Sequence, residues 1–274
     1  MIYRTDSFVH DGHRLVYDVY GDDGPVLVYL HGLMIDSEIN RGIADAVAGR
    51  GHRVVLLDLL GHGRSDKPTF ASEYRMDTYA GQVIGLLDHL GEPSVALGGM
   101  SLGANVSLFA ASMHPSRIRG LVIEMPVLEW AVPSAALLFT PLLLLAHYGQ
   151  PVLQATSRLI RRVPVTPWAP LNSLLHGASM DPEAMAAVLH GILVGPVAPT
   201  IEQRRAIQAP ALVLAHGKDL IHPFGDAENL AAQLPNSTLV EAHSPFELRL
   251  HPERLTEVIG EFLDELQPPV RRVG

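Results

Sequence analysis

A serine stands between two glycines at residues 99–103, in the pattern Gly-x-Ser-x-Gly. An apolar run at residues 94–100 precedes the serine, and a helix-like run at residues 102–113 follows it. A serine on such a sharp strand-to-helix turn has an exposed hydroxyl, and flanking glycines remove the Cβ atoms that would clash there. The pattern predicts that Ser101 is a nucleophile. Without that context, the same five residues describe a tight turn whose serine caps a helix.

A serine hydroxyl becomes a good nucleophile only when a base takes its proton, and the chain offers 14 histidines for that role. His243 follows the strand-like run at residues 237–242 and precedes the last helix, so we expect it to be the base. His216 and His222 lie near an earlier strand end and compete for the role. His251 begins the last helix and is interpreted as a capping or surface residue.

The base in turn needs a carboxylate to orient it. Asp219 follows the apolar run at residues 211–217 and keeps the chain order serine, acid, histidine. Glu124 and Glu129 are the other candidates, whereas Asp58 precedes the serine. We expect Asp219 to be the acid; otherwise it is a loop carboxylate that caps the next helix.

An acyl-transfer reaction also needs backbone N–H groups where negative charge develops on the attacked carbonyl. Leu102 follows the nucleophile at a helix start, and its N–H is one expected donor. The second is expected from the loop at residues 31–34, where Gly32 allows a turn and Leu33 offers the N–H. The alternative is a plain strand-to-loop turn.

These side chains must be held by strands and helices that alternate along the chain. Two short strands around Asp11-Gly12 predict an opening hairpin. Continuous apolar runs are typical of buried parallel strands, because helices cover both faces of such a sheet. Such runs occupy residues 25–30, 53–60, 94–100, 119–125, 211–217 and 237–242. Helical patterns lie between them, at residues 37–49, 78–90, 102–113, 226–233 and 253–266. The alternation predicts an α/β fold with a mostly parallel sheet.

The alternation is interrupted at residues 126–200, which are rich in proline and carry no charged residue from Trp130 to Ser157. This segment predicts short helices inserted between two strands. We therefore expect a core formed by residues 1–125 and 201–274, and a helical cap at residues 126–200 after the sixth strand.

The chain resembles the α/β-hydrolase superfamily over nearly its whole length. The matching motifs are YLHGL (29–33), DLLGHGRSDKP (58–68), GGMSLGA (98–104), HGKDLIHP (216–223) and AHSPFELRLHPERL (242–255). The resemblance implies an eight-stranded sheet, a cap after the sixth strand and a Ser-His-Asp triad formed by Ser101, His243 and Asp219.

The chain departs from the family's pattern around the expected base. Ala242 stands where the family usually has glycine before the histidine, and the spacing from His243 to the Pro252-Glu253 helix start is longer than usual. These departures concern the local shape of the loop. Haloalkane dehalogenases and most epoxide hydrolases of this fold use an aspartate nucleophile, and Ser101 at that position argues against both activities.

The apolar content of residues 126–200 predicts either helices buried against each other or a lipophilic pocket. We expect the pocket to be lined by a set of residues from the cap and from the loops around Ser101. The set comprises His31, Met34, Met100, Trp130, Phe139 and His222.

The leading functional hypothesis is hydrolysis of a carboxylic ester with a lipophilic part, through an acyl-enzyme. A carbon–carbon hydrolase, lactonase, thioesterase or cofactor-free perhydrolase would use the same triad, because fold and triad do not fix the substrate. A non-catalytic ligand-binding protein and a lipid enzyme whose cap docks on membranes are further alternatives. No cofactor or metal is expected, since the histidines are scattered and the glycines at residues 61–63 lack a phosphate-binding pattern.

The bulk composition excludes several other classes. The net charge is −9 and no basic stripe is evident, which argues against a nucleic-acid partner. The chain has no cysteine, so disulfides and thiolate chemistry are excluded. The first residues lack the apolar run of an export signal, and the longest apolar stretch, residues 135–146, is shorter than the about 20 residues of a membrane span. We expect a cytoplasmic enzyme with a small-molecule substrate.

Overall fold

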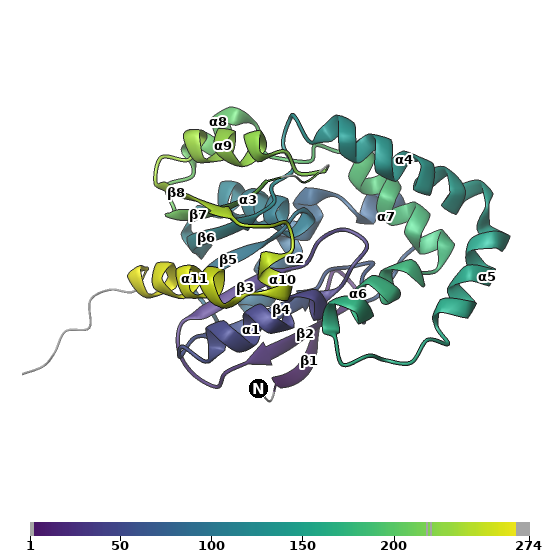
Figure 1. Cartoon of the computed structure of the whole chain (residues 1–274), viewed down its shortest axis with the longest axis horizontal. Coiled ribbons are helices and arrows are strands. Elements are labelled where there is room, and N and C mark those ends of the chain that lie inside the picture. The colour runs from purple at the N-terminus through teal and green to yellow at the C-terminus, as the bar shows by residue number, and fades with distance from the viewer. Residues whose placement is uncertain (1–2, 218, 220, 267–274) are drawn as a thin grey trace, which may run out of the picture.

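The computed structural model describes residues 3–217, 219 and 221–266. Its centre is an eight-stranded sheet in the order β1-β2-β4-β3-β5-β6-β7-β8 (Figure 1). The strands are β1 (Tyr3–His10), β2 (His13–Tyr20), β3 (Val26–Leu30), β4 (Arg53–Asp58), β5 (Val95–Met100), β6 (Ile118–Glu124), β7 (Ala211–His216) and β8 (Ser237–Ala242). β2 pairs antiparallel with β1 and β4, and the other neighbouring strands pair in parallel. The predicted α/β class with a mostly parallel eight-stranded sheet is confirmed.

Helices cover both faces of the sheet, which explains why the inner strands are apolar on both sides. One face packs against α1 (Arg41–Ala48), the short α10 (Glu247–Leu250) and α11 (Glu253–Glu265). The other packs against α2 (Met76–Leu90), α3 (Leu102–Met113) and α9 (Phe224–Gln233). Three single-turn 3-10 helices, η1 (Ser37–Asn40), η2 (Ala71–Glu73) and η3 (Pro115–Arg117), and the short helix α8 (Ile201–Ala206) complete this part of the chain. Every residue of β3 and β7 is buried, so the centre of the molecule is formed by these strands and their neighbours.

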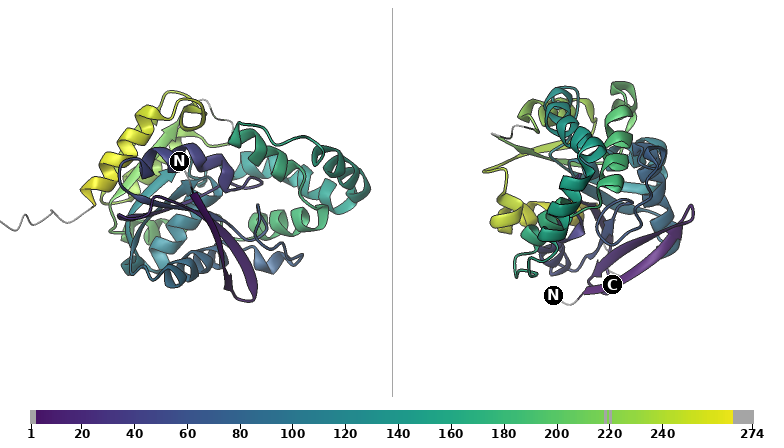
Figure 2. Two further views of the ribbon diagram at one scale, coloured as in Figure 1. Left: turned by 90° about the horizontal axis from the view of Figure 1, so that it is seen from below. Right: turned by 90° about the vertical axis from the view of Figure 1, so that its right-hand side faces the viewer.

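Residues 126–200, called the insertion below, lie between β6 and β7. They form α4 (Val132–Tyr148), α5 (Gln150–Ile160), α6 (Ala169–Ala178) and α7 (Pro182–Val194). In Figure 1, α4, α5 and α6 make an arch at the right-hand end of the molecule, and α7 lies inside it. Figure 2 shows the same arch from two further sides, extending beyond one end of the sheet. The insertion has a small apolar cluster of its own, centred on Ala146, Met185 and Leu189.

Two buried polar side chains hold the ends of the insertion to the core. Asn105 of α3 donates to the carbonyls of Val127 and Val197, at 2.7 and 2.6 Å, and accepts from the N–H of Val127. Asp226 of α9 is fully buried and accepts backbone N–H groups from residues 128, 130 and 131 at 2.8–3.1 Å. Both ends of the insertion are therefore fixed where the chain leaves and re-enters the core.

Candidate active site

Ser101 occupies the turn between β5 and α3, where the backbone is strained. Its φ and ψ are 52° and −111°, a backbone conformation that residues other than glycine rarely adopt. The flanking glycines make this turn possible: a Cβ on Gly99 would lie 2.7 Å from the carbonyl oxygen of Leu30, and one on Gly103 would lie 2.6 Å from the same atom. The N–H of Ser101 donates to the carbonyl of Glu124 at 2.9 Å, which ties the turn to β6.

Asp219, His222 and Ser101 form a continuous chain of hydrogen bonds. Nδ1 of His222 lies 3.0 Å from Oδ2 of Asp219, and Nε2 of His222 lies 3.0 Å from Oγ of Ser101. A carboxylate can only accept, so Nδ1 carries the proton and Nε2 is free to accept from the serine hydroxyl. This is the arrangement of an acid, a base and a nucleophile in a serine hydrolase.

The loop after β7 creates this geometry. Oδ1 of Asp219 accepts the N–H groups of Ile221 and His222, at 2.7 and 3.1 Å, so the chain turns tightly around the carboxylate. Burial alone would raise the pKa of Asp219. The hydrogen bond and charge of His222, together with the two N–H groups, outweigh that effect and lower the pKa to about 2. Asp219 is therefore an anion that holds His222 in one tautomer.

The structure does not bring His243, the expected base, to Ser101. The His243 side chain is 76% exposed, and its nearest carboxylate oxygen, on Glu247, is 4.0 Å away. The backbone explains this: the N–H of His243 donates to Glu247, which Arg254 holds at 2.7 Å, so the chain turns immediately after β8. The position beside Ser101 is taken by His222, which the sequence offered as a competitor and as a pocket residue.

The other candidate acids are engaged elsewhere. Glu124 is 1% exposed and binds Arg249 and the hydroxyl of Tyr29, both at 2.9 Å. Burial would raise its pKa, but the charge of Arg249 and a contact from His216 lower it to about 2. Glu129 pairs with Arg204 at 2.5 Å. Asp219 is left as the carboxylate that contacts His222.

The loop at residues 31–34 lies directly against the serine. A Cβ on Gly32 would lie 3.6 Å from the Cβ of Ser101. Buried His31 fixes the loop, because its Nε2 accepts the N–H of Leu59 at 3.0 Å and its Nδ1 donates to the carbonyl of Gly32 at 2.8 Å. Burial lowers the pKa of His31, which keeps the ring neutral for this pattern. Leu33 and Leu102 therefore border the same space as Ser101.

A small apolar cavity of about 50 Å³ adjoins Ser101. Core residues and helices α4 and α7 of the insertion share its wall. The lining includes Leu33, Met76, Leu102, Asn105, Ala135, Phe139, Ile192, Leu193 and Ile221. Ligand pockets usually measure about 300–1,000 Å³, so a substrate of ordinary size enters only if the insertion shifts.

The structure places two of the six expected pocket residues at this site: Phe139 lines the cavity and His222 contacts Ser101. Met100 points to Arg249, whose Nη2 lies 2.8 Å from its sulfur. Trp130 is 61% exposed and packs near Gly225. His31 binds the carbonyl of Gly32 within the loop, and Met34 packs against the insertion's apolar cluster.

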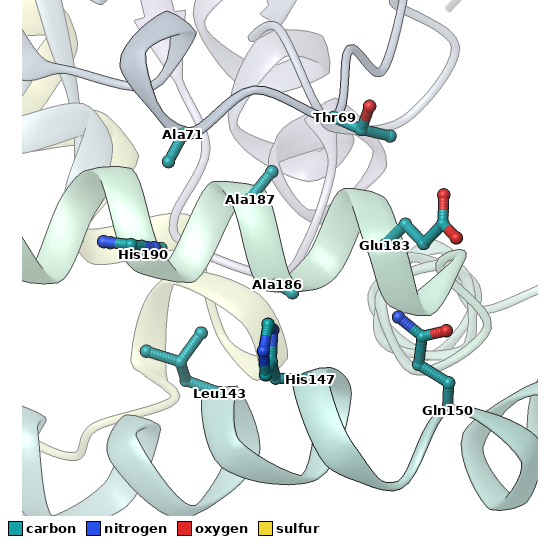
Figure 3. Close-up of a pocket in the computed structure, with 9 residues that line it drawn as sticks. All are labelled: Thr69, Ala71, Leu143, His147, Gln150, Glu183, Ala186, Ala187 and His190. Carbon is teal, nitrogen blue, oxygen red and sulfur yellow. The ribbon is translucent and has the colours of Figure 1, made fainter.

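A larger cavity of about 360 Å³ lies elsewhere, between α4, α7 and the segment at residues 69–71. Figure 3 shows Leu143, His147 and Gln150 on one side of α7, and Thr69 and Ala71 on the other. Ser101 does not line it, so we do not assign the reaction to this cavity. Within the described ranges, no group of three or more His, Asp or Glu side chains is arranged to hold a metal ion.

Comparison with known proteins places this geometry in a familiar fold. The family model of the alpha/beta hydrolase fold matches residues 25–150. The enol-lactonase of Burkholderia xenovorans LB400 superimposes with a TM-score of 0.77, over 94% of this chain and all of that one, at 22% identity.

Two curated relatives show how far sequence similarity extends. Epoxide hydrolase B of Mycobacterium tuberculosis (strain ATCC 25618 / H37Rv) is 38% identical over 99 residues, which is 36% of this chain and only 28% of that enzyme. An uncharacterized protein of Mycobacterium bovis (strain ATCC BAA-935 / AF2122/97) is 25% identical over 283 residues, covering 94% of this chain and 80% of that protein. The similarity to the first is confined to a short stretch, and the second spans almost the whole chain.

Proposed function

Because the chain belongs to the α/β-hydrolase superfamily, we propose that it hydrolyses a carboxylic ester through an acyl-enzyme, with Ser101 as nucleophile, His222 as base and Asp219 as the acid that orients it. The observation that carries the proposal is the chain of two 3.0 Å hydrogen bonds from Asp219 through His222 to Ser101. The insertion acts as a cap over the site in this proposal.

The reaction proceeds in two halves. Oγ of Ser101 attacks the ester carbonyl while Nε2 of His222 takes its proton. The N–H groups of Leu33 and Leu102 stabilise the oxyanion, and the alcohol leaves with the proton from His222. Water then attacks the acyl-enzyme while His222 takes the proton of that water, and the acid leaves as His222 returns the proton to Oγ of Ser101. The apolar lining around Phe139 favours a lipophilic group on the substrate.

The similarity to an epoxide hydrolase does not favour epoxide opening here. A serine alkoxide that opened an epoxide would form an ether, which has no carbonyl for water to attack, and the enzyme would stop after one turnover. An ester, lactone or thioester instead leaves an acyl group on Ser101 that water can remove. The nucleophile's chemistry therefore favours acyl substrates.

The two histidines provide the decisive experiment. We expect Ser101→Ala and His222→Ala to lower kcat/KM for an aryl ester by roughly 10³-fold or more. His243→Ala serves as the matched control, and we expect it to stay within a few-fold of the parent because its side chain is exposed. Loss of activity in His243→Ala with retention in His222→Ala would assign the base to His243 instead.

The acyl group is tested separately. A matched series of aryl esters, lactones, thioesters and dienoate carbon–carbon substrates is assayed, and the adduct on Ser101 is identified by mass spectrometry. We expect the highest kcat/KM for esters. Turnover of every ester no faster in the parent than in Ser101→Ala would refute the proposal.

A further inference from the structure

The insertion carries most of the exposed large apolar side chains. Among the described residues, 13 of the 21 large apolar side chains that are exposed lie between Trp130 and Leu174. We call this surface the outer face, and its members are Trp130, Val132, Leu137, Leu138, Leu144, Leu145, Tyr148, Val152, Leu159, Val163, Val165, Trp168 and Leu174. Single exposed apolar residues are common on proteins, but thirteen within one segment favour an interaction site.

Helix α4 divides the outer face from the catalytic cavity. Leu137, Leu144 and Tyr148 recur at spacings of seven and four residues, which places them on one side of the helix, and they are 79%, 51% and 79% exposed. Ala146 is fully buried on the inner side. Phe139 of the same helix lines the cavity beside Ser101. One helix therefore presents apolar side chains both to the cavity and to the exterior.

The central part of the insertion is net positive, although the insertion as a whole, with Glu129, Asp181 and Glu183, holds as many acidic as basic residues. Residues 130–180 contain three of the 20 Lys and Arg residues and none of the 29 Asp and Glu residues. The three are Arg158, Arg161 and Arg162, which are exposed and lie on either side of Leu159 in the chain. Arg161 donates to the carbonyl of Ser179, and the described carboxylates form no ion pair with any of the three. Exposed apolar side chains with cations beside them match a partner that has an apolar interior bordered by anionic groups.

Both tryptophans of the chain lie on the outer face. Tryptophan is enriched where an apolar phase meets water, because its ring is largely apolar and its N–H is polar. Arginine can likewise bury its stem while its guanidinium remains at a polar interface. No single helix among the described residues is long and apolar enough to cross a bilayer; α4 and α5 meet that test together, but they are bent by 101°.

We propose that the outer face binds the surface of a bilayer that contains anionic lipids. The apolar side chains of α4 and α5 enter the boundary between headgroups and acyl chains, and Arg158, Arg161 and Arg162 pair with lipid phosphates. The arch of α4, α5 and α6 at one end of the molecule allows this contact while the sheet stays outside the membrane (Figures 1 and 2). This binding does not depend on the proposed reaction.

Association of two copies through the outer face is the main rival. A symmetric dimer would place this surface against itself. The arginines of one copy would then face residues 130–180 of the other, which hold no acidic residue, and Asp181, which borders a pocket together with Arg158 and Arg161. Three arginines from each copy would approach with one Asp181 from each copy between them, so the excess of positive charge favours anionic lipid over a second copy.

The test uses the full chain and vesicles of two compositions, phosphatidylcholine alone and phosphatidylcholine with phosphatidylglycerol. Co-sedimentation measures binding, and the emission of the two tryptophans reports their environment. We expect binding and a blue shift with the anionic vesicles, weakened by salt because charge attraction is screened. We expect Arg158→Gln/Arg161→Gln/Arg162→Gln to weaken that binding by roughly tenfold or more.

The controls separate the outer face from general charge and from folding. The triple variant Arg4→Gln/Arg75→Gln/Arg205→Gln removes equal charge from exposed positions outside the insertion and should leave vesicle binding unchanged. Leu137→Ser/Leu144→Ser/Tyr148→Ser should weaken binding while circular dichroism stays that of the parent. Three results overturn the proposal: no association with either vesicle, equal loss in both arginine triples, or outer-face variants that change only the oligomeric state.

Discussion

The core and the insertion use opposite means to stay in place. The core buries charged side chains and pairs them: Glu124 and Arg249 are 1% and 7% exposed and lie 2.9 Å apart. The insertion has few ionic contacts and leaves large apolar side chains in the open. The core is held by buried ion pairs, whereas the insertion is held by hydrogen bonds at its ends, by the contact of α6 with Asp36 and by the apolar packing of α7.

The largest expected effect comes from breaking the buried ion pair of the core. Glu124→Gln leaves Arg249 buried without a counter-charge, and we expect the free energy of unfolding to fall by about 3 kcal/mol. Urea denaturation at neutral pH measures this loss. Asp77→Asn is the control: its pair with Arg75 is exposed, and the expected loss is below about 1 kcal/mol. Equal losses in both variants would contradict the conclusion that buried ion pairs stabilise the core more than exposed ones do.

The same variant tests the acid stability of the core. The pKa of Glu124 is about 2 in the fold and 4.5 for the ordinary carboxyl, so its contribution is present above pH 4.5 and is lost as the pH falls toward 2. The difference in unfolding free energy between parent and Glu124→Gln should therefore shrink across this range. Denaturation midpoints measured at several pH values give the comparison, and a constant difference would contradict the assignment.

A smaller and different effect is expected where the insertion touches the core. A Cβ on Gly177 of α6 would lie 1.7 Å from the carbonyl oxygen of Met34, so Gly177→Ala forces α6 and the loop at residues 31–34 apart. We expect kcat/KM for the best ester to fall by roughly 10- to 100-fold, because that loop borders Ser101. The unfolding midpoint should change little.

Gly42→Ala is the matched control for that variant, since a Cβ at Gly42 meets no atom within 4 Å. It should leave both kcat/KM and the midpoint close to those of the parent. If Gly177→Ala instead lowered the midpoint as much as Glu124→Gln does and spared kcat/KM, the insertion would belong to the same rigid unit as the core.

The contact of α6 with η1 should depend on pH. Nδ1 of His176 lies 2.7 Å from Oδ2 of Asp36, and this hydrogen bond raises the pKa of His176. A raised histidine pKa gives a contribution that is complete below about pH 6.5 and is lost as the pH rises through the folded-state pKa. Glu38 and Asp58 add to the attraction.

Amide hydrogen exchange in α6 measures this effect. After correction for the intrinsic exchange rate, protection should be greater at pH 5.5 than at pH 8.5 in the parent. His176→Gln should abolish the difference. The same pH profile in the variant would show that another group is responsible.

The smallest effect is expected on the exterior of α4. Leu137→Ser and Tyr148→Ser replace side chains that are 79% exposed, and the free energy of unfolding should stay within about 0.5 kcal/mol of the parent. Urea denaturation again provides the measurement. A loss above 1–2 kcal/mol would mean that these side chains are buried in solution, for example against a second copy.

The sequence predicted the core because its signals are local. The apolar runs that form β3 to β7 cannot be exposed on either face, and Gly91, with φ +70°, ends α2 where the sequence placed the helix end. The strand-to-helix turn at Ser101 was also evident from its two glycines. These features depend on the chain within a few residues of each position.

The proposed base could not be predicted in the same way. His222 and His243 both follow strands of the same parallel sheet, so position alone gives each a route to the edge where Ser101 lies. The two histidines differ in the geometry of their loops. Asp219 accepts two N–H groups and the chain turns so that the His222 ring faces Ser101. Glu247 accepts the N–H of His243, and the His243 ring is exposed to solvent. The three-residue spacing of Asp219 and His222 was the available signal, since it permits such a turn.

The pocket residues were harder still, because they depend on how helices face one another. Phe139 was found, yet Ile192 and Leu193 of α7 were not among the expected residues. Both helices are apolar on most sides, so their sequences do not indicate which side faces Ser101. The tilt and rotation of α4 and α7 decide this, and they arise from packing across the whole insertion.

The hydrogen bonds of Asn105 mark two points at which the insertion could be replaced by another segment. Asn105 joins Val127 to Val197, and β6 and β7 on either side of the insertion are neighbours in the sheet. A different insertion that begins and ends at these two points would therefore leave the register of β6 and β7 unchanged. The same junction offers protein engineers a place to build chimeras.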